Sequence, residues 1–164
     1  MAQRFGVVFV SRRNSLRSIL AQACLAHLGA DRFSAFSCGQ PGHISATIHP
    51  AAVGALRSAS IPVPLVQPRG WDDLARASSP RADFIITLDE ATQPVQPRWP
   101  GQPDAALWAL PDAVALGNPE ETARAAIQML YALRRRLELL ISLPLHGADR
   151  AAIRSDVRDL AHMQ

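Results

Sequence analysis

A short polar loop, residues 11–18, holds the side chains with the clearest chemical use. It reads Ser-Arg-Arg-Asn-Ser-Leu-Arg-Ser and therefore carries three arginines and three hydroxyl groups in eight residues. Guanidinium groups and converging backbone amides bind oxyanions, and the positive end of a helix dipole adds to the attraction. The loop thus predicts a cradle for phosphate or a similar oxyanion. A solvated turn that happens to contain arginines is the alternative.

The segments on either side of this loop have the patterns of a buried strand and an amphipathic helix. Residues 5–10, Phe-Gly-Val-Val-Phe-Val, form a continuous apolar run, which is typical of a strand buried on both faces of a parallel sheet. After the loop, apolar residues recur at three- and four-residue spacing from Leu16 to His27, and Gly29 suits the end of a helix. A strand, a short loop and a helix are the start of a βαβ unit.

Further strands and helices are expected along the chain. The strands are residues 33–38, 83–88 and 105–110, and the helices are residues 50–59, 119–143 and 149–163, with a short one at 71–77 and proline-rich loops at 61–70 and 93–103. Two helix starts carry the usual signals, because Pro50 lies in a first turn and Asn118 precedes Pro119. This order predicts one α/β domain of three layers, a four-stranded parallel sheet with helices on both faces.

Composition places the chain among ordinary folded domains. Hydrophobic residues make up 48% and charged residues 19% of 164 residues, enough to bury a core. The net charge of +3 gives no strong signal for nucleic acid. The apolar run at the N-terminus is too short for a signal peptide or a membrane span, so we expect a cytoplasmic protein without a membrane partner. Cys24 and Cys38 lack the spacing of metal ligands or of a disulfide framework, and we expect neither a metal nor a cofactor.

The order of residues in the loop resembles the low-molecular-weight tyrosine phosphatase and arsenate reductase family. That family has an apolar strand, then a cysteine, five residues, an arginine and a serine. Val10, Asn14, Arg17 and Ser18 match this pattern, and Ser11 stands at the cysteine position. Similar segments follow at residues 37–39, 49–52, 83–89, 99–101 and 108–112. The resemblance covers roughly residues 4–143.

The resemblance implies a role for each of these residues. The backbone amides of residues 12–17 and the Arg17 guanidinium would hold the oxyanion, so the anion-binding residues are Arg12, Arg13, Asn14, Ser15, Leu16, Arg17 and Ser18. Asn14 would brace the loop, and Ser18 would donate a hydrogen bond toward position 11. Ser11 would occupy the place of the nucleophile, and Asp112 would be the general acid. The implied partners are phosphate, sulfate or a phosphorylated ligand.

Several residues depart from the family pattern. A serine hydroxyl has no lowered pKa, and no base stands nearby in the sequence to activate Ser11. Arg13 takes the place of a loop glycine, and Ala113 follows Asp112 where the family commonly has proline. Thioredoxin-coupled arsenate reduction needs two cysteines beyond the third strand, and none follows Cys38. A single Cys→Ser exchange would explain Ser11 but not Arg13, which favours natural divergence of the whole loop.

Three functions are compatible with this combination. We favour a pseudo-phosphatase that binds phosphate, a similar oxyanion or a phospho-ligand at the loop between the first strand and the first helix. The second is a weak phosphomonoester or phosphotyrosine hydrolase that uses Ser11 with Asp112. The third is a structural or interaction protein whose pocket is vestigial. An ordered anion in the loop would separate the first two from the third, and turnover of an aryl phosphate would separate the second from the first.

The C-terminal part of the chain predicts packing rather than chemistry. We expect a phosphatase-like domain over residues 1–143 and a helical extension, residues 144–164, packed on the same domain. Three consecutive arginines, residues 134–136, predict a solvated helix face rather than a nucleic-acid patch. The three tryptophans predict core or pocket-wall positions. A homodimer through the last two helices is the alternative to simple packing.

Overall fold

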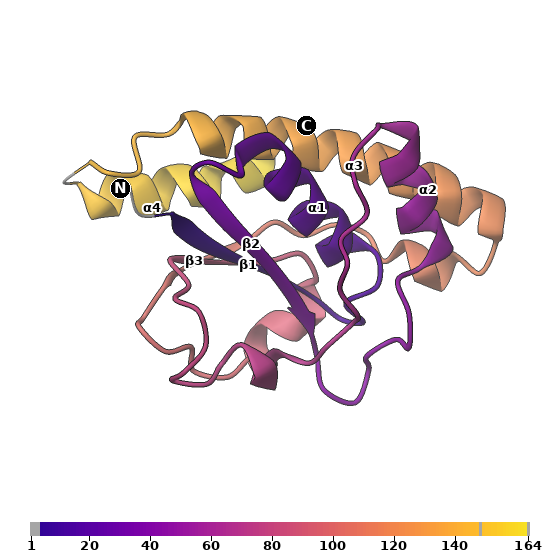
Figure 1. Ribbon diagram of the computed structural model, residues 1–164, viewed down its shortest axis with the longest axis horizontal. Coiled ribbons are helices and arrows are strands. Elements are labelled where there is room, and N and C mark those ends of the chain that lie inside the picture. The colour runs from indigo at the N-terminus through magenta and orange to yellow at the C-terminus, as the bar shows by residue number, and fades with distance from the viewer. Residues whose placement is uncertain (1–3, 148, 164) are drawn as a thin grey trace.

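The computed structural model describes residues 4–147 and 149–163. Its four parallel strands, β1 (Phe5–Ser11), β2 (Phe33–Gly39), β3 (Phe84–Thr87) and β4 (Asp104–Leu107), form one sheet in the order β2-β1-β3-β4 (Figure 1). The predicted fold class is confirmed. The strand order reverses between β1 and β3, and ligands of such sheets bind outside the carboxyl ends of the strands at this switch point. The loop after β1 opens there.

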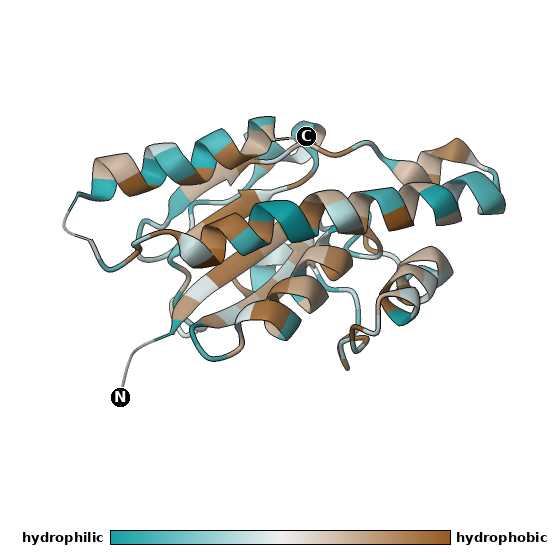
Figure 2. Cartoon of the chain, turned by 90° about the horizontal axis from the view of Figure 1, so that it is seen from above, coloured by the Kyte–Doolittle hydropathy of each residue, from teal (hydrophilic) through white to brown (hydrophobic). Residues whose placement is uncertain are grey.

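The described residues form four α-helices beside the sheet, namely α1 (Arg17–Gly29), α2 (Pro50–Ser58), α3 (Pro119–Ser142) and α4 (Arg150–Asp159). Buried residues of all four belong to one apolar cluster that includes Val7 and Phe9 of β1. The predicted start of α3 is confirmed, because the Asn118 side chain accepts hydrogen bonds from two amides of the first turn. Figure 2 shows mostly brown strands behind helices on which teal and brown residues alternate.

The opposite face of the sheet is covered by shorter elements. Val8 and Val10 of β1 belong to a smaller cluster with Trp71 and Leu74. The helix predicted at residues 71–77 is only a 3₁₀ turn, η1 (Trp71–Asp73), and a second 3₁₀ helix, η2 (Glu90–Val95), enters the loop predicted at 93–103. The four α-helices therefore pack in the cluster around Val7, and the 3₁₀ turn η1 packs against the face of the sheet that carries Val8 and Val10.

Arginine side chains join α4 to the edge strand β4. Arg150 Nη2 and Arg154 Nε lie 2.7 and 2.8 Å from the two carboxylate oxygens of Asp104. One turn further, Arg158 Nε donates to a backbone carbonyl of β4 at 3.1 Å. Because these arginines recur every four residues, a single face of α4 follows the strand.

The tryptophans have the surroundings that were predicted for them. Trp108 is fully buried, and its indole Nε1 donates to the Val157 carbonyl of α4 at 3.0 Å. Trp71 is buried, and Trp99 packs against the same cluster. The indole of Trp108 thereby ties the helical extension to the core of the domain.

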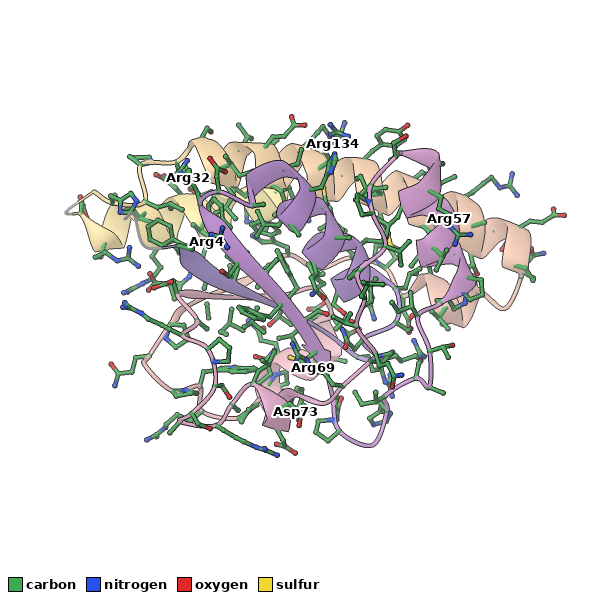
Figure 3. All side chains as sticks on the ribbon, viewed as in Figure 1. Arg4, Arg32, Arg57, Arg69, Asp73 and Arg134 are labelled. Atoms are coloured by element: carbon green, nitrogen blue, oxygen red, sulfur yellow. The ribbon has the colours of Figure 1, made fainter. Side chains whose placement is uncertain are left out.

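One of the three consecutive arginines of α3 differs from prediction. Arg134 lies on the outer face and pairs with a glutamate one turn away at 3.1 Å (Figure 3). Arg136, in contrast, is 7% exposed, and its Nη2 donates to the Met163 carbonyl. Burial and the charge of Arg135 lower the pKa of Arg136, and within the described residues its Nε and Nη1 atoms have no partner. The prediction of a solvated face is wrong here because the C-terminal segment covers the residue.

Among the described residues, no helix is long and apolar enough to cross a bilayer. The same residues contain no group of three or more His, Cys, Asp or Glu side chains placed to hold a metal ion. The carboxylates near the loop after β1, Asp89 and Asp112, pair with arginines instead.

Candidate anion-binding site

The loop between β1 and α1 carries its polar side chains into the interior. Five of these residues are at most 4% exposed, namely Ser11, Asn14, Ser15, Arg17 and Ser18. The chain turns at Asn14, whose φ of 53° lies in the left-handed region that asparagine tolerates better than most residues. Arg13 does not have a positive φ, so its backbone needs no glycine.

Ser18 is the centre of a small hydrogen-bond network inside the loop. Its Oγ lies 2.7 Å from Ser11 Oγ and accepts from Asn14 Nδ2 at 2.8 Å. Because the Asn14 amide donates to Ser18 Oγ, the Ser18 proton is available for Ser11 Oγ. Asn14 and Ser18 are therefore in contact inside the loop, and the bracing role that the resemblance implies for them stays a prediction.

The carboxyl end of β2 supports the loop from the side. Figure 3 shows Arg69 at this end, where its amide donates to Asn14 Oδ1 at 3.0 Å and its Nε to the Ser37 carbonyl at 3.2 Å. Gly39 allows the strand to come close, because a Cβ there would lie 2.9 Å from the Arg12 carbonyl oxygen and 3.0 Å from the Asn14 nitrogen. The loop is therefore held on both of its flanks.

Carbonyl oxygens of the loop accept hydrogen bonds from the segment after β2, whereas the loop amides find no backbone acceptor within the described residues. The carbonyls of Arg12, Arg13 and Ser15 accept from the amides of Gln40, Ser45 and His49, at 3.0, 3.1 and 2.9 Å. In the part of the chain that the structure describes, no amide of residues 12–18 donates to a backbone carbonyl. Unpaired amides in a buried segment are rare, and a set of them at a helix N-terminus is suited to an anion.

Arg17 is fixed by groups at the ends of β3 and β4. Its Nη1 lies 2.9 Å from Asp89 Oδ1 and donates to the Leu110 carbonyl at 3.0 Å. Its Nη2 is 3.9 Å from Asp112 Oδ1. Asp89 also caps η2 by accepting from the Thr92 amide. Sequence reasoning assigned no role to Asp89, although its place two residues after β3, the neighbour of β1, was a signal for one.

Asp112 is held by Arg13 across 99 positions of the sequence. Arg13 Nη1 donates to both carboxylate oxygens, at 2.8 and 2.7 Å. Burial alone would raise the pKa of Asp112, but the hydrogen bond from Arg13 and the charges of Arg17 and Arg13 lower it below its usual value. The carboxyl is therefore an ionised, paired group in this arrangement.

The ion pair lies over the cradle and leaves little room in it. Between Ser11, Ser15, Arg17 and the Arg13–Asp112 pair the free volume is about 10 Å³. A single water needs roughly 10–15 Å³ of such space. A tetrahedral oxyanion with five heavy atoms needs more space than this.

No strong nucleophile lies in the cradle. Ser11 Oγ contacts Ser18, and no base is bonded to it among the described residues. Burial raises the pKa of the Cys38 thiol, one residue before the end of β2, to about 12. It also raises that of Cys24 to about 11. Neither thiol can serve as a relocated thiolate.

An apolar groove of about 640 Å³ lies beside the cradle, between the first turns of α2 and α3. Its walls include Pro50, Gly54, Pro119 and Ile127, and Val114 lines both the groove and the small cradle cavity. The two spaces therefore share one wall.

Six of the nine predicted site residues line one small cavity, and three do not. Ser11, Arg13, Ser15, Leu16, Arg17 and Asp112 line the cradle cavity. Asn14 and Ser18 lie behind it and contact each other. Arg12 is not among the described residues that line the cavity, and its carbonyl accepts a hydrogen bond from the Gln40 amide. Val114 is the wall residue that sequence reasoning missed.

Comparisons with known proteins support the family resemblance and the fold. The family model of low molecular weight phosphotyrosine protein phosphatases matches residues 6–103. Among curated proteins, the glutaredoxin arsenate reductase of Synechocystis sp. is 28% identical over 106 residues, which span 65% of this chain and 76% of that protein.

Two solved structures show the same architecture. An arsenate reductase in the phosphate binding state has a TM-score of 0.68 at 25% identity, covering 84% of this chain and 97% of that one. A low molecular weight protein tyrosine phosphatase from T. tengcongensis has a TM-score of 0.65, covering 84% and 98%. Its 17% identity shows the fold alone.

Proposed function

Because the chain belongs to the low molecular weight phosphotyrosine protein phosphatase family, we propose that it binds phosphate or a similar oxyanion in the loop after β1 without hydrolysing esters there. The observation that carries this proposal is the set of amides of residues 12–18 that lack backbone acceptors at the start of α1. Arg17 adds a buried charge at the same place. A tetrahedral anion satisfies both features.

The ligand class is a tetrahedral oxyanion, free or carried on an organic group. The solved arsenate reductase similar to this chain is described in its phosphate binding state, which supports phosphate as a probe ligand. Arsenate and sulfate share its shape and charge pattern. The apolar groove beside the cradle has room for the organic part of a phosphomonoester.

Two features argue against catalysis in this loop. At the place of the family's cysteine, Ser11 offers a hydroxyl with no bonded base, so the nucleophile is weak. Asp112 has a lowered pKa and an arginine partner, whereas a general acid must be protonated at the working pH. Loss of a thiolate does not weaken anion binding, because it removes a negative charge from the site.

A phosphate titration followed by amide chemical shifts tests this proposal. We expect the amides of residues 12–18 to shift together and to saturate. Arg17→Lys should weaken binding, because lysine keeps the charge but loses the planar fork. The matched control is Arg134→Lys on the outer face of α3, which should bind as the wild type does. Shifts centred on α3 instead of the loop would place the anion elsewhere and end the proposal.

A further inference from the structure

We infer that Asp112 is an internal competitor for the cradle and that Arg13 latches it there, so that an oxyanion binds only when the Arg13–Asp112 pair opens. The inference rests on the proposed function, because it concerns access to the same cradle. It assigns a gating role to Arg13, the residue that replaces the loop glycine.

Geometry shows what the pair does to the cradle. Both oxygens of Asp112 accept from Arg13 Nη1 at 2.8 and 2.7 Å, and one lies 3.9 Å from Arg17 Nη2. The carboxylate thus stands among the cationic groups of the cradle. The remaining volume of about 10 Å³ excludes a phosphate.

The balance of charges near the cradle also supports this inference. Two arginines, Arg13 and Arg17, are matched by two carboxylates, Asp112 and Asp89. When Asp112 leaves, the cradle gains a net positive charge and the unpaired amides become accessible. A dianion can then form the charged contacts with the arginines that Asp112 had formed before it left.

The two carboxylates differ in how firmly they are held. Asp89 is 10% exposed, pairs with a buried arginine and caps a helix turn. Asp112 and Arg13 are 24% and 28% exposed, and water can hydrate both side chains as they separate. Arg13 is also free of backbone strain, since its φ is not positive. The outer pair is therefore the part that moves, while Asp89 keeps Arg17 in place.

Access to the cradle can be measured without any anion. In a Ser11→Cys background, iodoacetamide alkylates the new thiol, and its plateau rate at high pH no longer depends on the fraction of thiol that is ionised. Arg13→Ala should raise that plateau rate by about tenfold, the factor that corresponds to about 1.4 kcal/mol of closing free energy. Arg12→Ala is the matched control, because it removes the same charge from the adjacent position while no ion pair of Arg12 exists among the described residues. Equal plateau rates in the two variants overturn the latch.

A second experiment tests whether Asp112 competes with phosphate for the cradle. Asp112→Asn should lower the dissociation constant for phosphate about tenfold, measured by calorimetry. Asp156→Asn, a surface change of the same charge on α4, should leave it unchanged. Equal affinity of wild type and Asp112→Asn overturns the competition. Faster alkylation in Arg13→Ala with no phosphate binding in any variant retains the latch and removes the proposed function instead.

Discussion

Asp89 and Arg17 form a buried ion pair, 2.9 Å between Oδ1 and Nη1, that joins the end of β3 to the start of α1. Arg17 is 4% and Asp89 10% exposed, so each charge depends on the other for compensation. The pair sets the direction of the guanidinium while its Nη2 faces the cradle. A carboxylate outside the loop thus determines where the main cation of the site lies.

The first prediction concerns this pair. Asp89→Asn leaves the Arg17 charge buried without its partner and should reduce the free energy of unfolding by about 3–5 kcal/mol. Urea denaturation measures the change. The double variant Arg17→Met/Asp89→Asn should recover part of the loss, because it removes both charges. A loss below about 1 kcal/mol in Asp89→Asn would mean that solvent reaches the pair.

Hydrolysis is the subject of the second prediction. Purified wild-type protein should turn over an aryl phosphate no faster than a blank, because Ser11 has no bonded base and Asp112 is held ionised. Release of the aryl alcohol, followed by absorbance, is the measurement. Ser11→Ala provides the control. A steady wild-type rate that disappears in Ser11→Ala would show that the hydroxyl is an active nucleophile.

A cysteine at position 11 should titrate below the ordinary thiol value of about 8.5, which is the third prediction. The thiolate would lie beside unpaired amides, the first turn of α1 and Arg17, all of which favour the charged form. Adding Asp112→Asn should lower this pKa further, since a neighbouring negative charge is removed. Alkylation rate against pH reports it, and Cys24 and Cys38 stay silent because burial raises their pKa values to about 11 and 12. A thiol that titrates at its ordinary value would mean that the loop does not concentrate positive potential.

The fourth prediction is a dependence of stability on pH. The folded pKa of Asp112 lies below its unfolded value of about 4, so between the two values the unfolded chain binds more protons. The stabilisation is complete above about pH 4 and is lost as the pH falls through the folded pKa. Urea midpoints at acid pH should therefore fall less steeply in Asp112→Asn than in the wild type. Asp156→Asn is the control, and identical slopes in all three proteins would contradict the ion pair.

The sequence predicted most of the fold because its signals are local. The apolar run before Ser11, the cap at Asn118 and the proline at Pro50 each fix an element from neighbouring residues alone. The short 3₁₀ helices were harder to predict, because a single turn leaves no periodic pattern in the sequence.

Pairings between distant segments could not be predicted from the sequence. Arg13 meets Asp112 across 99 positions, and Asp89 meets Arg17 only because β3 lies next to β1 in the sheet. The burial of Arg136 depends on where the segment that ends at Met163 folds back. A family resemblance named Asp112 and Arg17, but only the arrangement in space shows that one faces the other.

The arginine contacts between α4 and β4 have a consequence for self-association. An edge strand exposes backbone groups that another chain can extend, and this pairing is a common route to aggregation. Here Arg158 already occupies a carbonyl of β4, and Asp104 anchors two more arginines of α4 across the same strand. Helix α4 thus covers the edge strand β4 and protects it from pairing with another chain. Salt weakens ion pairs at the surface, so it would weaken the contacts between α4 and β4 before it disturbs the core.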